Sequence, residues 1–340
     1  MGTSQYLPVG VVVGMRNSAT TIVACLKGLI SQTYPIAEIV VVDNVSTDAS
    51  AGLVEDFAKS SPVAVRLIRQ SVNGGLTSSY NLGAEIVTAS LLVFVHSDSM
   101  LPSPQEIERL VEPLLSDPQV VAAYSVLLMP EEVWERFPFW QKYLFARMAL
   151  IEKPCMCGKF DCIRKEAYLK VGGHNVKRFT ATCGYGGEDS DLNARLKKVG
   201  KIVGSSARVV HLHDLGPGYR LGALFKTRKM LARTYGKILV FEGLRPLTGK
   251  VPLLIKPALA VLPLVPHLFV EGCIIFFIFS LVYSRRMFTT RCTLMNWRIL
   301  LVPVIDVALI YHETFWFIEG LLTPSADARA SSPSRSKRDA

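Results

Sequence analysis

The chain has 340 residues, of which 50% are hydrophobic, and a formal net charge of +10. A mean hydropathy of +0.31 is high for a soluble enzyme, and this apolar content excludes disorder as the state of the whole chain. Residues 1–214 hold 21 basic and 21 acidic residues, whereas residues 215–340 hold 17 and 7, so the excess lies in the second part. Because those basic residues flank long apolar runs, we expect membrane lipids as partners and no nucleic acid.

The first part is long enough to form a globular domain with its own core. The chain has seven cysteines, an odd number without a paired framework, and its first residues lack the charged and apolar regions of a signal peptide. We therefore expect reduced thiols in the cytosol and no cleaved leader.

Short apolar runs alternate with helical periodicity in the first part. Predicted strands cover 9–14, 39–42, 63–68 and 91–95, and predicted helices cover 20–32 and 49–59. This alternation indicates an α/β fold with a mostly parallel sheet, whose functional groups lie at the carboxyl ends of the strands. Polar residues follow those ends: Arg16 and Asn17, Asp43 and Asn44, and His96 and Asp98.

The common phosphate-binding glycine motifs are absent from the sequence. No G-x-G-x-x-G follows the first strand and no G-x-x-x-x-G-K-[ST] occurs anywhere, which argues against dinucleotide dehydrogenases and P-loop NTPases. The motifs present are Val-Val-Asp-Asn-Val-Ser-Thr-Asp at 41–48, Asn-Gly-Gly at 73–75, His-Ser-Asp-Ser at 96–99 and Gly-Gly-Glu-Asp-Ser-Asp-Leu at 186–192. In this order they resemble the family 2 glycosyltransferases of the GT-A fold, a Rossmann-like, mostly parallel sheet flanked by helices. The resemblance covers about residues 8–235.

The resemblance implies a site for a nucleotide-sugar donor, in which Asp43 contacts the base. Asp48, in the Ser-Thr-Asp turn, either contributes to that site or caps the following helix. The residues expected to bind the substrate are Arg16, Asn17, Asp43, Asn73, Gly74, His96, Ser97 and Glu188.

The family also implies a divalent cation, Mg²⁺ or Mn²⁺, held by an Asp-x-Asp motif after the fourth strand. Here His96 replaces the first Asp, and Asp98 remains as the expected metal ligand. The imidazole of His96 either hydrogen-bonds the donor or joins a Mn²⁺ shell. A His at the end of a later strand is also expected near the metal. We favour His211 over His213, and both side chains point to the same face if that strand continues.

Asp189 is the predicted catalytic base. Inverting glycosyl transfer needs a carboxylate to take the proton from the acceptor hydroxyl, and in the family the second residue of Glu-Asp does so. The pair Glu188-Asp189 opens a predicted helix over 190–199. First-turn charge at a helix start is the alternative explanation of this pair.

The second part has two apolar blocks. The block 251–283 contains four prolines and breaks near Pro266, so it forms either two short crossings or one crossing plus an interfacial or re-entrant helix. The block 299–322 is long enough for one crossing. The ionisable residues in or beside the blocks either mark a path for a lipid phosphate or acceptor, or lie at the interface; they are Glu271, Asp306, His312, Glu313 and Glu319.

These observations divide the chain into four regions. Residues 1–215 are the expected cytosolic GT-A domain, 216–250 a basic amphipathic juxtamembrane region, 251–322 a transmembrane region of two or three helices, and 323–340 a disordered basic tail. The densest basic cluster adjoins the first domain. We therefore expect an integral membrane protein whose catalytic domain faces the cytoplasm.

The expected function is metal-dependent transfer of a sugar from a nucleotide sugar to a lipid-linked or envelope-glycan acceptor, with inversion. The absence of the Gln-x-x-Arg-Trp motif of processive family members favours the addition of a single sugar. One alternative is a polyprenyl-phosphate glycosyltransferase, whose phosphate acceptor needs no strong base. The other is a non-catalytic, membrane-anchored protein that binds nucleotide sugars.

Overall fold

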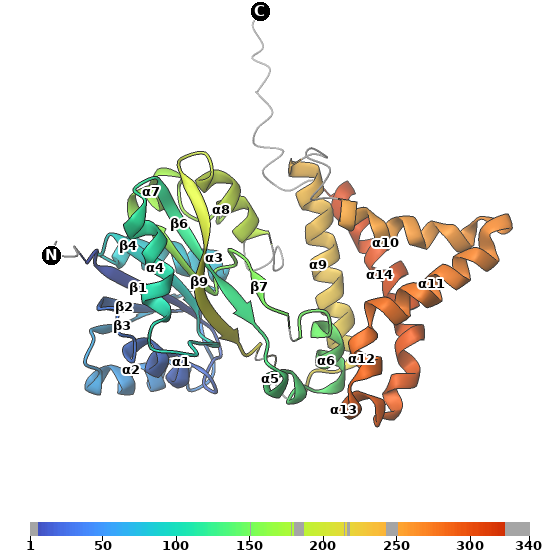
Figure 1. Cartoon of the computed structure of the whole chain (residues 1–340), viewed down its shortest axis with the longest axis horizontal. Helices are drawn as coiled ribbons and strands as arrows, with labels where there is room; N and C mark the ends of the chain where they lie inside the picture. Colours follow the sequence, from blue (N-terminus) through green and yellow to red (C-terminus); the bar gives the residue numbers. More distant parts are fainter. Residues whose placement is uncertain are drawn as a thin grey trace, which may run out of the picture. The chain divides into compact units, whose positions relative to one another are not determined.

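The computed structural model describes residues 6–149, 151–177, 179, 187–213, 215, 218–242 and 251–323. These residues belong to two compact units (Figure 1). The first unit comprises Met1–Arg136, Met148–Thr182 and Glu188–Gly216, and the second comprises Phe137–Arg147, Cys183–Gly187 and Pro217–Ala340. The predicted disordered tail, apart from Thr323, lies outside the described residues.

The first unit is built on one nine-stranded sheet with the order β3-β2-β1-β4-β8-β6-β9-β5, and β7 pairs with β6. The strands β1 to β4 are mutually parallel, β8 runs antiparallel to β4 and β6, and β6 is parallel to β9. The strands are β1 Val9–Met15, β2 Ile36–Asp43, β3 Val65–Arg69, β4 Leu91–His96, β5 Ser99–Met100, β6 Val120–Leu128, β7 Lys153–Pro154, β8 Phe160–Arg164 and β9 Lys201–His211.

Helices cover both faces of this sheet. On one face, α1 (Ile22–Ile30), α2 (Ser50–Ser60) and α4 (Glu106–Ser116) pack against residues such as Val11 and Val13 of β1. On the other face, α3 (Gly75–Ile86), α7 (Lys165–Lys170) and α8 (Glu188–Leu196) pack against residues such as Val12. The helix α5 (Glu131–Glu135) follows β6.

Burial on both faces explains why β1 reads as a continuous apolar run instead of an alternating one. The predicted α/β fold with a mostly parallel sheet is therefore confirmed.

The second unit is helical. Its 3-10 turns Leu262–Leu264 and Pro266–Leu268 separate α10 from α11, so the chain breaks at Pro266 as the sequence predicts. A further 3-10 turn, Trp297–Leu301, precedes α14. The α-helices are α6 Phe139–Phe145, α9 Leu221–Glu242, α10 Val251–Val261, α11 Phe269–Tyr283, α12 Arg285–Thr289, α13 Arg291–Leu294 and α14 Val302–Leu322.

Two helical segments of the second unit are long and apolar enough to cross a membrane, judged by length and composition alone. They are Pro266–Tyr283 and Trp297–Leu322. A shorter apolar helix covers Leu254–Leu264. Large apolar side chains of α11 are exposed, among them Phe277, Ile278 and Val282.

Replacement of Gly83 by alanine should destabilise the first unit. A Cβ at Gly83 would lie 2.3 Å from Cγ1 of Val12, which is fully buried in the central strand. Overpacking of this kind costs about 1–3 kcal/mol. We expect Gly83→Ala to lower the melting temperature of the purified chain.

The matched control is Gly52→Ala in α2, where an added Cβ has no atom within 4 Å. Helix propensity should make that change neutral or stabilising by up to about 1 kcal/mol. Equal melting temperatures for the two variants would contradict the packing of α3 on β1.

Candidate active site

Three strand ends meet in the first unit. His96 ends β4, Asp98 lies just before β5, and His211 ends β9. The short antiparallel pairing of β5 with β9 sets Ser99 opposite His211, and the Leu212 amide donates to the Asp98 carbonyl at 3.0 Å. Residues more than 100 positions apart in the sequence are therefore fixed beside each other by backbone hydrogen bonds.

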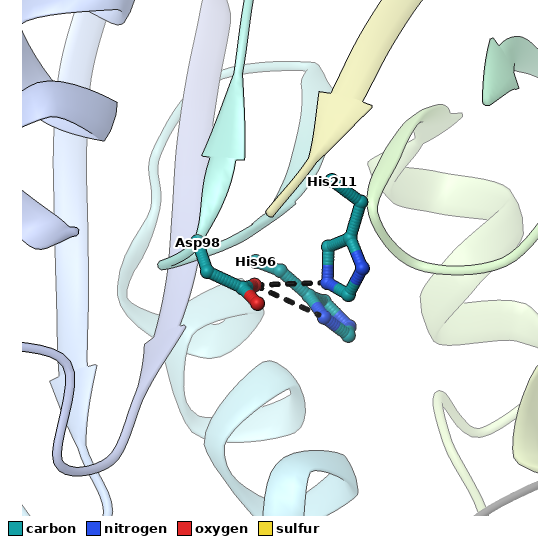
Figure 2. A group of neighbouring side chains, drawn as sticks. All are labelled: His96, Asp98 and His211. Atoms are coloured by element: carbon teal, nitrogen blue, oxygen red, sulfur yellow. Dashed lines mark ion pairs between the residues drawn. The ribbon is translucent and has the colours of Figure 1, made fainter. Parts of the chain in front are cut away.

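The side chains of this cluster converge (Figure 2). Nε2 of His211 lies 2.9 Å from Oδ1 of Asp98, and Nδ1 of His96 lies 3.9 Å from the same oxygen. One possible ligand atom from each residue lies within 4.8 Å of the others. Nε2 of His96 is buried and has no hydrogen-bond partner among the described residues. One carboxylate and two imidazoles with spare ligand capacity fit a divalent cation.

The electrostatics of the cluster agree with that fit. Burial, followed by the charges of Lys159 and His211, holds the pKa of His96 well below its usual range. Burial alone would raise the pKa of Asp98, but the charge and hydrogen bond of His211 outweigh it and lower that pKa. A neutral imidazole beside an ionised carboxylate is the protonation state in which these groups bind a metal.

The condition set for His213, that its strand continues beyond His211, is not met. The strand β9 ends at His211, and His213 has a φ of 50°, so the two residues do not alternate along one strand. The rings still meet, with Nδ1 of His211 2.9 Å from Nδ1 of His213. This contact leaves Nε2 of His211 directed at Asp98, so His213 orients the ring of His211.

The loops after β2 and β3 are tied together by Asn44. Its Nδ2 donates to Oδ1 of Asn73 at 2.8 Å, and its Oδ1 accepts from the Gly74 amide at 3.1 Å. Asp43 is buried, and its Oδ1 accepts from the Ser46 amide at 3.1 Å. The structure thus brings Asp43, Asn73 and Gly74 to one edge of the sheet. Asn44 is the residue that holds them there.

The loop after β1 joins the same edge. Asn17 has a φ of 51°, and its Oδ1 accepts a hydrogen bond from the Thr47 amide at 2.8 Å. Asp48 accepts from the Ala19 amide at 3.1 Å and from the Ser50 amide at 3.0 Å, so its carboxylate links two loops and supports the start of α2. The hydroxyl of Ser97 lies 2.7 Å from that of Ser18. Arg16 is exposed.

Asp189 lies against the loop that precedes β8. The helix α8 begins at Glu188, slightly before the predicted start at 190. Asp189 packs closely against Gly158: if Gly158 carried a Cβ, that atom would lie 3.2 Å from Oδ1 of Asp189. Gly158 has a φ of +67°, a conformation that favours glycine. Its carbonyl accepts from the Tyr80 hydroxyl at 2.6 Å, and its amide donates to Oδ2 of Asp161 at 2.5 Å. The surface beside Asp189 is therefore rigidly held.

The carboxyl of Asp189 is destabilised as an anion. Burial, the neighbouring Glu188 and Asp161 raise its pKa well above the ordinary value, and the ammonium of Lys159 opposes this shift in part. Lys159 links Asp189 to the cluster of His96, Asp98 and His211. Its charge also acts on His96 and His213. Its carbonyl accepts a hydrogen bond from Ser99 Oγ at 3.1 Å. The sequence did not single out Lys159; its only local signal is the Gly-Lys-Phe-Asp stretch at 158–161.

The sequence is similar to glycosyltransferases. Residues 10–172 match the sequence model of the family described as glycosyl transferase family 2. An uncharacterized glycosyltransferase of Escherichia coli K12, YibD, is 29% identical over 131 residues, which are 38% of this chain and 37% of that protein. EpsJ of Bacillus subtilis 168, also an uncharacterized glycosyltransferase, is 34% identical over 31% of this chain and 29% of its own length. The chain spans about a third of the length of these curated relatives.

Solved structures share the fold, among them two glycosyltransferases. The mannosyltransferase PcManGT from Pyrobaculum calidifontis, in complex with GDP-Man and Mn²⁺, has a TM-score of 0.56 and 19% identity and covers 93% of this chain and 88% of its own. GalNAc-T7 with UDP, GalNAc and Mn²⁺ has a TM-score of 0.50 and 18% identity, with coverage of 68% and 48%. The predicted resemblance to family 2 glycosyltransferases and the predicted GT-A fold are both confirmed.

Replacement of Asp98 by asparagine should remove most of the affinity for Mn²⁺. The carboxylate is the only anionic member of the His96–Asp98–His211 cluster. Loss of outer contacts alone costs about 10–100-fold in metal affinity, so loss of this ligand should cost more than about 100-fold. Titration calorimetry of the purified chain with Mn²⁺ would measure it.

The control is His267→Ala, which removes an exposed imidazole from the second unit and should leave the affinity unchanged. An Asp98→Asn variant that binds Mn²⁺ as tightly as the wild type would place the metal elsewhere.

Proposed function

Because the chain contains a glycosyl transferase family 2 domain, we propose that it transfers a single sugar from a nucleotide sugar to an acceptor hydroxyl, with inversion. The acceptor is a lipid-linked or envelope glycan. The observation that carries this proposal is that one domain holds both a cluster at Asp98 that fits a divalent cation and, against the loop before β8, the carboxylate of Asp189 with its raised pKa. The bond between Ser99 Oγ and the Lys159 carbonyl connects the two groups.

The donor is a nucleoside diphosphate sugar. Of the two similar structures, PcManGT is in complex with GDP-Man and Mn²⁺, and GalNAc-T7 is with UDP, GalNAc and Mn²⁺. Both support a nucleoside diphosphate sugar as the donor of a chain with the same fold. In this proposal Asp43, Asn73 and Gly74 bind the nucleoside, and Arg16, Asn17 and Ser97 lie on the loops around it. Two imidazoles beside one carboxylate favour Mn²⁺ over Mg²⁺, because Mg²⁺ prefers oxygen ligands.

Asp98 and His211 hold the cation, with His96 beside them. When bound, the cation neutralises the charge that develops on the leaving diphosphate. Asp189 receives the proton of the acceptor hydroxyl as that oxygen attacks the anomeric carbon. Its raised pKa makes it a stronger base than an ordinary aspartate, and the ammonium of Lys159 stabilises its ionised form.

We further propose that the second unit attaches the chain to a membrane, with the first unit on the cytosolic side. Two helical segments are apolar and long enough for insertion, and α11 exposes large apolar side chains along its length. The helix α9 contributes basic residues, which favour the cytosolic leaflet and its anionic headgroups.

Asp189→Asn should lower kcat by about 10²–10⁴-fold with little change in the KM for the donor, because an amide cannot accept the proton. In the wild type, Asp189 must be ionised to act as a base. The pKa of Asp189 is raised, so kcat should fall as the pH decreases through a value above the ordinary range of aspartate. Release of nucleoside diphosphate against pH would measure both effects.

Asp191→Asn is the matched control, because Asp191 lies in the same helix but is paired with Arg195 at 2.7 Å. The Asp191→Asn variant should keep the wild-type kcat and the same fall of kcat at low pH. Activity that survives Asp189→Asn would instead indicate a phosphate acceptor, which needs no base, and donor binding without turnover would indicate a binding protein.

Ile278→Lys should weaken membrane attachment several-fold in a vesicle flotation assay. Ile278 is 54% exposed in the middle of the apolar α11, where a lysine opposes insertion. The control is Val72→Lys, at a position that is 74% exposed in the first unit. If both variants float like the wild type, α11 does not enter the bilayer.

A further inference from the structure

The helices α9 and α14 of the second unit pack side by side and in the same direction (Figure 1). His312 contacts the Phe225 carbonyl at 3.1 Å, Lys229 lies over the Trp316 ring, and Arg233 pairs with Glu319 at 2.5 Å. Oε1 of Glu313 lies 3.8 Å from Nε of Arg228 in α9. Three of the ionisable residues within the apolar blocks, His312, Glu313 and Glu319, therefore face α9. Asp306 is also engaged, accepting hydrogen bonds from the hydroxyls of Tyr143 and Ser284.

One group of charges in this unit is not balanced. Three cations surround the ring of Tyr283, the last residue of α11: Arg147 Cζ and Lys256 Nζ each lie 4.7 Å from its centroid, and Arg228 Cζ lies 6.0 Å away. We call Arg147, Arg228, Lys256, Tyr283 and Glu313 the Tyr283 cluster. Its three cations face one carboxylate within the cluster, and Asp306 nearby is the second.

Part of the hydrogen-bonding capacity in the cluster is unused. Lys256 pairs with Oε2 of Glu313 and donates to the Tyr283 hydroxyl at 3.2 Å. Nε of Arg228 lies 3.8 Å from Oε1 of Glu313, which is too far for a hydrogen bond. Neither of these two buried atoms has a hydrogen-bond partner among the described residues. These two atoms are thus joined only as an ion pair, without a hydrogen bond. With Asp306 counted, three cations face two carboxylates, so the cluster keeps one excess positive charge.

The position of the cluster in the unit indicates what would fill it. It lies at the end of α11, whose Ile278 and Val282 are 54% and 65% exposed. A lipid headgroup placed at this end of α11 would meet the cations, and its hydrocarbon chain would lie along exposed apolar side chains of the helix. Phosphate oxygens match guanidinium and ammonium donors, and a hydrocarbon chain matches α11.

We propose that the Tyr283 cluster binds the phosphate group of a membrane lipid. Arg147, the exposed member, and Lys256 contact the phosphate oxygens together with Arg228. Within the proposed function, on which this last step rests, the bound phosphate belongs to the lipid that carries or accepts the sugar. The binding itself requires neither donor nor turnover.

The test measures partition of the purified full chain into phosphatidylcholine vesicles that contain one added lipid. The additions are a long-chain isoprenyl phosphate, phosphatidic acid, the matching isoprenol, and oleate as an anion without phosphate. We expect both phosphate lipids to increase binding over oleate and isoprenol. An increase with isoprenyl phosphate alone would indicate that the site selects an isoprenyl phosphate lipid, and an equal increase with phosphatidic acid would indicate a general anchor for phosphate lipids.

Arg147→Gln should reduce the gain from phosphate lipids about fivefold, the usual effect of one basic residue near a lipid surface. Arg147 is exposed, so this variant should fold normally. Arg298→Gln is the matched control, because Arg298 Cζ lies 5.2 Å from the Trp297 centroid and outside the cluster. Asp98→Asn should bind lipid like the wild type, which separates failure of this inference from failure of the proposed catalysis.

Three results would overturn the inference. Oleate could promote binding as strongly as the phosphate lipids, which would show a response to charge alone. Arg298→Gln could lose as much as Arg147→Gln, which would remove the cluster from the explanation. Inorganic phosphate could abolish the gain at concentrations equal to those of the lipid phosphate, which would show a site for the free anion.

Discussion

The pairing of β5 with β9 is the constraint on which the proposed chemistry depends. It sets Ser99 opposite His211, so that Asp98, just before β5, meets the imidazole at the end of a strand more than 100 residues later. Without this pairing the chain would have a histidine at the end of β4 and an aspartate just after it, but no second imidazole beside them. The contact between His211 and His213 then fixes the ring, and the cluster with His96 is complete.

The same constraint extends to the proposed base. The hydroxyl of Ser99 donates to the carbonyl of Lys159, which follows Gly158 in the loop packed against Asp189. Asp161 and Tyr80 hold that loop by hydrogen bonds to its backbone. Lys159 therefore lies where its charge acts on both the imidazoles and Asp189, and a movement of β5 would disturb all of them.

Much of the first unit could be predicted from its sequence, because buried parallel strands are apolar runs that end in polar residues. Asp43, His96 and Asp98 follow directly from this rule. The role of Asn44 and the place of Lys159 could not be predicted, since their partners are distant in the chain. The sequence could not show whether the strand continues to His213, because a local pattern does not reveal that β9 ends at His211 and that His213 has a positive φ. The contacts of Glu313 with α9 and α10 likewise arise only from helix packing.

The most direct test of the central claim is release of nucleoside diphosphate from a panel of GDP- and UDP-sugars by the purified chain in lipid vesicles, with Mn²⁺ or with EDTA. Our account predicts turnover of one donor class that requires Mn²⁺ and is lost in Asp98→Asn. The control Asp117→Asn, which changes a partly exposed aspartate paired with Lys201, should remain active. Turnover that EDTA does not reduce, or that persists in Asp98→Asn, would contradict the proposed role of the His96–Asp98–His211 cluster.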